Sequence, residues 1–99
     1  MIKVIVGYKL KMGADIQPIL LKLRASAMQY PGFIGAENLI SEEDSSIVAT
    51  VTTWDKVENW KVFESSKIRQ DILEETEALL AEEPRIMIYR IVPTGRWRG

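Results

Sequence analysis

The chain contains no cysteine and no histidine. Without cysteine there is no disulfide frame, no thiolate nucleophile and no zinc finger. Without histidine there is no Ser-His-Asp triad, no histidine metal site and no imidazole base that titrates near neutral pH. The nucleotide-binding fingerprints GxGxxG and GxxxxGK[ST] are also missing from the sequence. Any chemistry must therefore use carboxylates, Lys, Arg, Tyr, Trp, Asn or a bound cofactor.

Charge and hydropathy exclude further classes of function. A net charge of −1 at pH 7 gives no electrostatic reason to expect binding to nucleic acid or to a membrane surface. The unbroken apolar runs are only a handful of residues, so we expect no membrane span. The first residues, MIKVIVGYKL, are typical of a strand and lack the long apolar run of a signal peptide. We therefore expect a cytoplasmic protein.

Length and composition indicate one domain. A chain of 99 residues with 46% hydrophobic and 27% charged residues is ordinary for a soluble globular protein. We expect the domain to cover residues 1–93. Residues 94–99 then form a short C-terminal tail, which we expect to be either poorly ordered or packed on a neighbouring subunit.

Hydrophobic periodicity divides this domain into alternating elements. Apolar residues alternate along the first segment and follow helical spacing after Asp15, which is a candidate helix cap. Gly, Pro and Ser clusters end the successive elements. The sequence predicts strands at 2–10, 33–40, 47–54 and 86–92, and helices from about 16 to 27, from Asp55 to Ser65-Ser66, and from about 67 to 82 with Ile68, Ile72, Leu79 and Leu80 on its apolar face.

The order βαββαβ is the ferredoxin-like arrangement, an α+β fold with a four-stranded antiparallel sheet and helices on one face. The uncovered face of such a sheet is normally polar. Here the last strand, IMIYRIV, is apolar on both faces, and so in large part is the first strand. A second copy of the chain is the simplest cover, so we expect a homodimer with sheets packed face to face. The alternative is a thin, partly exposed face.

The segment TTWDKVENWKVF carries the most specific pattern. A run of strand formers ends at Trp54, and Asp55 with Glu58 then forms a capping-box-like helix start. Trp60 and Phe63 fall on the inner face of that helix. These large aromatics either fill a core or line a cavity, and this choice decides what the protein does.

Residues 31–66, PGFIGAENLISEEDSSIVATVTTWDKVENWKVFESS, resemble the antibiotic biosynthesis monooxygenase (ABM) domain family. The shared pattern is a Pro-Gly-Phe after the first helix, a polar hairpin, a strand ending in Trp, and a helix with an aromatic residue. The resemblance extends in order and length over nearly the whole chain. It implies a dimeric α/β barrel with a pocket in each subunit between the sheet and the helices.

The family includes haem-degrading enzymes, whose residues this chain does not match. That branch uses an Asn on the first strand, a Trp on the second helix and a His one helix further on. The matching positions here are Tyr8, Phe63 and Leu73. Asn38 belongs to the second predicted strand and does not restore the pattern. The residues therefore do not fit haem degradation.

The family also includes quinol oxygenases, and oxygenases that act on polycyclic phenols with no metal or flavin. In such an enzyme the phenolate passes an electron to oxygen, and the protein binds the ring and stabilises the anion in a dry pocket. Tyr8, Trp60 and Phe63 are candidate walls for a small aromatic substrate. Tyr8, Asn38 and Arg90 are candidate catalytic residues that hold the developing oxyanion. We expect no cofactor and no metal.

Each of these residues also has a structural explanation. The structural alternatives are core packing for Trp60 and Phe63, a satisfied buried hydroxyl for Tyr8, backbone contacts for Asn38, and pairing across the sheet with Glu37 for Arg90. The acidic residues from Glu74 to Glu83 are expected to form a solvated face rather than a metal site. The alternative function is a non-catalytic protein that binds a small apolar ligand in the same pocket.

Overall fold

A four-stranded antiparallel sheet is the frame of the structure, a computed structural model that describes residues 1–93. Its strands are β1 (Ile2–Lys9), β2 (Phe33–Ile40), β3 (Ile47–Trp54) and β4 (Arg85–Arg90). They lie in the order β2-β3-β1-β4, with every neighbouring pair antiparallel. The predicted ferredoxin-like arrangement is therefore confirmed. The predicted tail at 94–99 lies outside the described residues.

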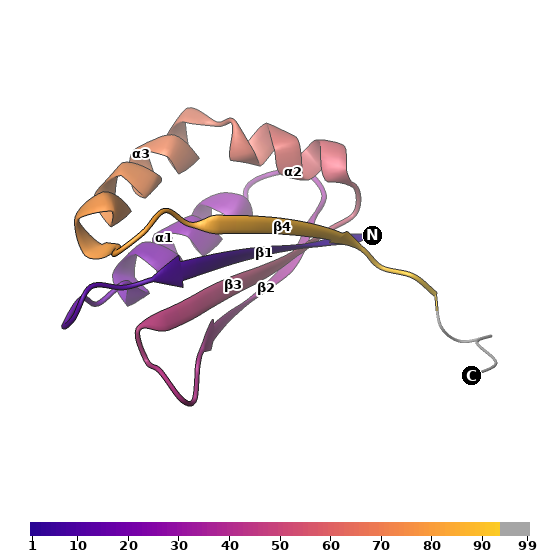
Figure 1. Cartoon of the computed structure of the whole chain (residues 1–99). Helices are drawn as coiled ribbons and strands as arrows, with labels where there is room; N and C mark the ends of the chain where they lie inside the picture. Colours follow the sequence, from indigo (N-terminus) through magenta and orange to yellow (C-terminus); the bar gives the residue numbers. More distant parts are fainter. Residues whose placement is uncertain (94–99) are drawn as a thin grey trace, which may run out of the picture.

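The helices lie over one face of this sheet (Figure 1). They are α1 (Gln17–Ala27), α2 (Val57–Glu64) and α3 (Lys67–Thr76), and α3 continues into the 3-10 turn η1 (Glu77–Leu79). The α-helix predicted for 67–82 therefore ends early. The reason is a pairing with the end of β1, where the Lys11 amide donates to the Leu79 carbonyl at 2.8 Å and the Ala81 amide donates to the Lys9 carbonyl at 2.8 Å. None of the helices within residues 1–93 is long and apolar enough to cross a membrane.

The helix ends differ in part from the prediction. The capping box at the start of α2 is not formed, because the N-cap is Lys56 and no side chain bonds to the helix end there. The Asp55 carboxylate instead accepts a hydrogen bond from the Asn59 side-chain amide at 2.7 Å. The break at Ser65-Ser66 is confirmed, and Ser66 caps α3 by accepting from the Arg69 amide at 3.3 Å.

The turn between α1 and β2 depends on Gly32. Its φ of +86° lies in the left-handed region that favours glycine. A Cβ built there would overlap the side chains of Asp55 and Asn59 at the start of α2. The Gly32 carbonyl also accepts a hydrogen bond from the Asp55 amide at 2.9 Å. This glycine therefore lets the chain pass against the N-terminal end of α2.

The core lies between the sheet and the helices. Alternate residues of β1 point toward the helices and are buried, as the period of two requires. An aromatic cluster fills the end of the core below α2, with Trp54 stacked on Phe63 at 5.7 Å between ring centroids and Trp60 6.1 Å from Phe63. Such ring pairs add about 0.5–1.5 kcal/mol each beyond the area that they bury.

The opposite face of the sheet is not covered by any element of residues 1–93, and it combines an apolar centre with the charged side chains of Lys3 and Glu37. The strand register places Ile5 between Val51 on β3 and Met87 on β4. Leu39 and Tyr89 share this face, which we call the open face. Met87 is 46% exposed and Tyr89 52% exposed.

Candidate functional site

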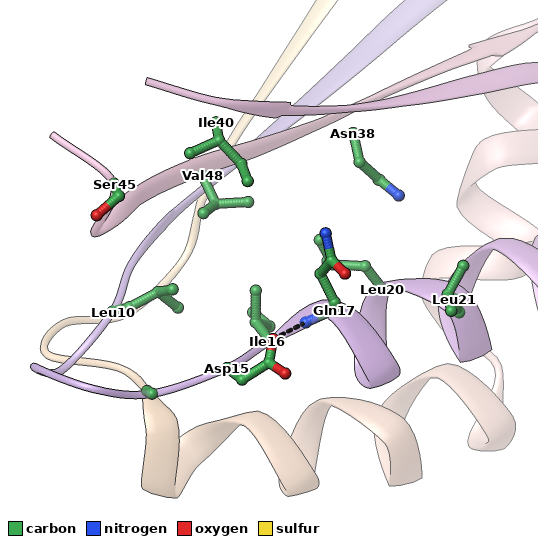
Figure 2. A pocket seen from close by; sticks show the side chains of 11 residues that line it. Leu10, Asp15, Ile16, Gln17, Leu20, Leu21, Asn38, Ile40, Ser45 and Val48 are labelled. Carbon is green, nitrogen blue, oxygen red and sulfur yellow. Dashed lines mark hydrogen bonds between the residues drawn. The ribbon is translucent and has the colours of Figure 1, made fainter. Parts of the chain in front are cut away.

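An apolar groove of about 320 Å³ opens between the start of α1 and the β2–β3 side of the sheet (Figure 2). Two of its polar side chains, the exposed Asn38 from β2 and Gln17 from α1, point toward one another across the groove. Its apolar walls are formed by Leu10, Ile16, Leu20, Ile40 and Val48. We call this space the outer groove. Its volume and lining are those of a site for a small organic molecule.

A second, much smaller space lies beside the outer groove, between the sheet and all three helices. This inner cavity of about 30 Å³ has walls from β1, α2 and α3, and it shares Leu20 and Asn38 with the outer groove. A space of this size holds one or two water-sized groups and no ring. The outer groove and the inner cavity are therefore adjacent, and only the outer groove is large enough for a ring. The inner walls include Tyr8, Thr50, Trp60, Phe63 and Arg69.

Four of the five candidate residues meet at the inner cavity. Tyr8, Asn38, Trp60 and Phe63 all line it, although they come from three different elements. Trp60 and Phe63 are also core residues, 2% and 3% exposed, so they both pack the domain and bound the cavity.

Arg90 does not join them. It is exposed on the edge strand β4, opposite Ile2 of β1, and lines neither the outer groove nor the inner cavity. Its predicted pairing with Glu37 is wrong within one subunit, because β4 and β2 form opposite edges of the sheet.

Tyr8 presents a buried phenol to the inner cavity. The side chain is 4% exposed. Burial raises the pKa of the Tyr8 hydroxyl, and the nearby Arg69 charge and a hydrogen bond with Thr50 offset this rise only in part. Tyr8 therefore stays protonated at neutral pH and can donate a hydrogen bond to a negative group.

Arg69 is a cavity residue that the sequence patterns did not reveal. The apolar spacing predicted Ile68 on the inner face of α3, but Ile68 is 47% exposed. The buried positions of α3 are Arg69, Ile72 and Thr76, so Ile72 is confirmed and Arg69 takes the inner position predicted for Ile68. The signal in the sequence was that Arg69 lies three residues before Ile72, which places both on the same face of the helix.

The Arg69 guanidinium is buried, and the nearby Glu64 carboxylate offsets its charge only in part. Arg69 is 7% exposed, lies 5.2 Å from the centre of the Trp60 ring and donates to the Glu64 carbonyl at 3.3 Å. Among residues 1–93, no carboxylate lies within ion-pairing distance of it. Burial lowers the pKa of Arg69, and Tyr8 and Glu64 act in the opposite direction. An arginine keeps its charge in such a setting because its reference pKa is so high.

Trp60 contributes a second unsatisfied donor. Its indole Nε1 is buried and has no hydrogen-bond partner among the described residues. Buried polar groups are nearly always paired, so an orphaned one needs an explanation. The inner cavity is thus bounded by a protonated phenol, a buried cation and a side chain with an unused N–H group. This arrangement suits a small negatively charged group.

The acidic residues from Glu74 to Glu83, at the end of α3 and beyond it, do not gather into a site. Within the part of the chain that the structure describes, no three Asp or Glu side chains are placed to hold a metal ion. Glu74, Glu75 and Glu77 are exposed, as are Glu82 and Glu83.

The fold is that of the ABM domain proteins, many of which share it with this chain over most of its length. No protein-family model matches the sequence, and no curated protein matches it either. The expected resemblance is therefore confirmed at the level of the fold.

Three solved structures illustrate the likeness. SnoaB, a cofactor-independent oxygenase from Streptomyces nogalater, is 11% identical, with 96% of each chain covered and a TM-score of 0.83. A protein from Nitrosomonas europaea, provisionally assigned as an antibiotic biosynthesis monooxygenase, is 14% identical, with 94% of this chain and all of that chain covered and a TM-score of 0.84. A protein from Bordetella bronchiseptica with the same provisional assignment is 24% identical. The match covers 93% of this chain and 97% of that chain, with a TM-score of 0.81.

Proposed function

We propose that this protein is a cofactor-independent monooxygenase of the ABM type that acts on a small phenolic or quinol substrate. The observation that carries the proposal is the adjacency of an apolar groove sized for a ring and an inner cavity lined with donors. The same fold in SnoaB, a cofactor-independent oxygenase, supports it. Because one fold can host many activities, the site and not the fold must be tested.

The proposed roles follow from the positions of the side chains. The substrate ring lies in the outer groove, and its ionised oxygen lies near Asn38 and Tyr8, where donors stabilise negative charge. Trp60 and Phe63 close the inner end and exclude water. The substrate then supplies all four electrons that reduce O₂. One oxygen atom enters the product as a quinone carbonyl, and the other leaves as water with two substrate hydrogens.

Oxygen uptake by the purified protein tests the proposal. A panel of hydroxyanthrones, quinols and simple phenols is offered, and quinone formation is followed optically in parallel. We expect uptake above the spontaneous rate, and a loss of about 10²-fold or more when a charge-stabilising donor is removed in Tyr8→Phe or Asn38→Ala. Val62→Ala, an exposed change on α2, is the control. No uptake from folded protein across the panel contradicts the proposal.

The second candidate function is binding without catalysis. It is favoured by the tight contacts between Trp54, Trp60 and Phe63, which leave an inner cavity of only about 30 Å³. A ligand held only by the apolar walls of the outer groove needs no donor. Binding of the panel compounds that is unchanged in Tyr8→Phe and Asn38→Ala, with no oxygen uptake, selects this function.

The assembly and location complete the proposal. We propose a cytoplasmic homodimer that pairs through the open face of the sheet. In that arrangement the outer groove stays accessible, because it lies on the helix-covered side.

A further inference from the structure

We propose that Arg69 binds the ionised oxygen of the ligand, and that the site selects ring compounds with a single anionic oxygen, as in a phenolate. This inference deepens the proposed function, on whose choice of site it rests. It concerns binding and ionisation, so it can be tested whether or not the protein turns the ligand over.

The first argument is the cost of the buried charge. An uncompensated charge inside a protein is expensive, and buried cations are normally paired with a carboxylate. The direct contacts of Arg69 within residues 1–93 are the backbone carbonyl of Glu64 and the face of the Trp60 ring, and the more distant Glu64 carboxylate offsets the buried charge only in part. A guanidinium carries five N–H donors, so most remain available. A negatively charged ligand supplies the missing compensation.

The second argument is the convergence of donors on one small space. Arg69, Tyr8 and Trp60 all line the inner cavity. Tyr8 is kept protonated by burial, and the buried Nε1 of Trp60 has no acceptor among the described residues. No carboxylate is among the residues that line this cavity, so the three donor-bearing side chains favour an acceptor that carries negative charge.

The third argument is size. The inner cavity of about 30 Å³ holds one or two water-sized groups and no ring, so it suits a single ligand oxygen better than a carboxylate with its two oxygens and carbon. The neighbouring outer groove of about 320 Å³ accommodates the ring. Leu20 and Asn38 border both spaces, so a ligand that spans them keeps its ring in the groove and places one oxygen in the cavity.

A purely structural role for Arg69 makes a different prediction. In that case its contacts with Glu64 and Trp60 only hold α3 against α2. Replacement of Arg69 then lowers the melting temperature but leaves ligand ionisation unchanged. The two roles are separable because a bound phenol reports its own protonation state.

The test uses 4-nitrophenol, whose phenolate and phenol forms have distinct absorption bands. The probe is titrated with the intact protein at a pH below the pKa of the free phenol. We expect the phenolate band to grow on binding, with release of a proton. Arg69→Gln is expected to weaken phenolate binding by about 10- to 100-fold and to abolish the spectral change. Lys61→Gln removes an equal charge from the exposed side of α2 and is the matched control, expected to bind like the wild type.

Two comparison ligands and a second variant complete the test. Nitrobenzene, which has no ionisable oxygen, and 4-nitrobenzoate, which has a carboxylate, are both expected to bind at least tenfold more weakly than the phenolate. Arg69→Lys keeps the charge and serves if Arg69→Gln fails to fold, as judged by circular dichroism; it is expected to retain part of the phenolate selectivity.

The inference is overturned if the wild type binds the probe as neutral phenol or not at all, if it prefers the benzoate, or if Arg69→Gln and Lys61→Gln behave alike. Phenolate selectivity that depends on Arg69, without oxygen uptake in any assay, upholds this inference while contradicting the monooxygenase proposal. Oxygen uptake that is unaffected in Arg69→Gln upholds the monooxygenase proposal and contradicts this inference.

Discussion

Tyr8 lies where β1 meets the side chains of α2 and α3 around the inner cavity. Its hydroxyl is stabilised in the protonated form, because burial outweighs the opposing influences of Arg69 and Thr50 on its pKa. A raised pKa in the folded state means that folding holds this proton more tightly than the unfolded chain does. The contribution to stability is therefore complete below the ordinary pKa of 10.0 and is lost as the pH rises through the folded value.

Tyr8→Phe tests this linkage. We expect the variant to lose about 1 kcal/mol at neutral pH, because the hydrogen bond with Thr50 is removed. Above pH 10 the gap between wild type and variant should narrow, since only the wild type loses the Tyr8 contribution there. Melting temperatures measured from pH 7 to the alkaline limit provide the comparison. A gap that stays constant at all pH values contradicts the raised pKa.

Gly32 provides a second test at the residue scale. Gly32→Ala forces a left-handed backbone on a residue with a side chain and presses its Cβ against Asp55 and Asn59, so we expect a cost of about 2–4 kcal/mol. Gly13 has a similar φ of +79° but open space around it, so Gly13→Ala should cost only about 1 kcal/mol. Chemical denaturation of both variants measures the difference. Equal losses of stability in the two variants would show that the close approach of Gly32 to α2 adds nothing to the cost of the substitution.

At the scale of elements, the β2–β3 hairpin loop is organised by one carboxylate. Asp44 accepts hydrogen bonds from the Ser46 hydroxyl at 2.6 Å and the Ser46 amide at 2.9 Å, and Lys9 bonds to its other oxygen at 3.1 Å. These bonds, with those of Ser46 foremost, lower the pKa of Asp44 from 3.8 to about 2. This loop matters for the site because Ser45, the residue that follows Asp44, lines the outer groove.

The expected result is an Asp44 carboxyl that titrates near pH 2 in an NMR experiment. Because this pKa is depressed by folding, the stabilising effect is present above pH 3.8 and disappears as the pH falls through about 2. Ser46→Ala removes the largest cause and should bring the pKa back toward 3.8. An Asp44 that already titrates at its ordinary value in the wild type contradicts this description of the loop.

The elements themselves were predictable from local pattern, whereas their contacts were not. The strict alternation of β1 and the breaks at Gly32 and Ser66 are local signals, and the structure confirms the elements that they delimit. The early end of α3 arises from its pairing with the end of β1, a long-range contact that no local pattern contains. Tertiary packing thus overrode helical spacing at that point.

The candidate site was predictable only in part, for a related reason. Tyr8, Trp60 and Phe63 sit at regular spacings on inward faces, so their convergence follows from the fold. Arg69 was missed because a charged residue on a helix is normally solvated, and Ile68 beside it offered an apolar alternative. Cavity volume depends on how the aromatic rings pack, which spacing does not determine.

At the scale of the whole molecule, the open face is the surface through which we propose that two subunits pair. Val51, Ile5 and Met87 form a row across three strands, with Leu39 and Tyr89 in the neighbouring rows, and no element of residues 1–93 covers them. An uncovered apolar area of this kind on a two-layer domain is a site for association. Pairing through a two-fold axis would bring the same face of two subunits together and bury it from both sides.

Met87→Glu tests this pairing. A carboxylate on this face must be desolvated on association, which costs several kcal/mol and should raise the dimer dissociation constant by about 100-fold or more. Because Met87 is 46% exposed and on the edge strand, the subunit itself should stay folded. Val62→Glu places the same charge at an exposed apolar position on α2, outside the open face, and should leave the dimer intact. Light scattering with size-exclusion chromatography should therefore give twice the 11.3 kDa chain mass for wild type and Val62→Glu, and the single mass for Met87→Glu. A monomeric wild type, or a Met87→Glu protein that still dimerises, would mean that the open face serves some purpose other than self-association.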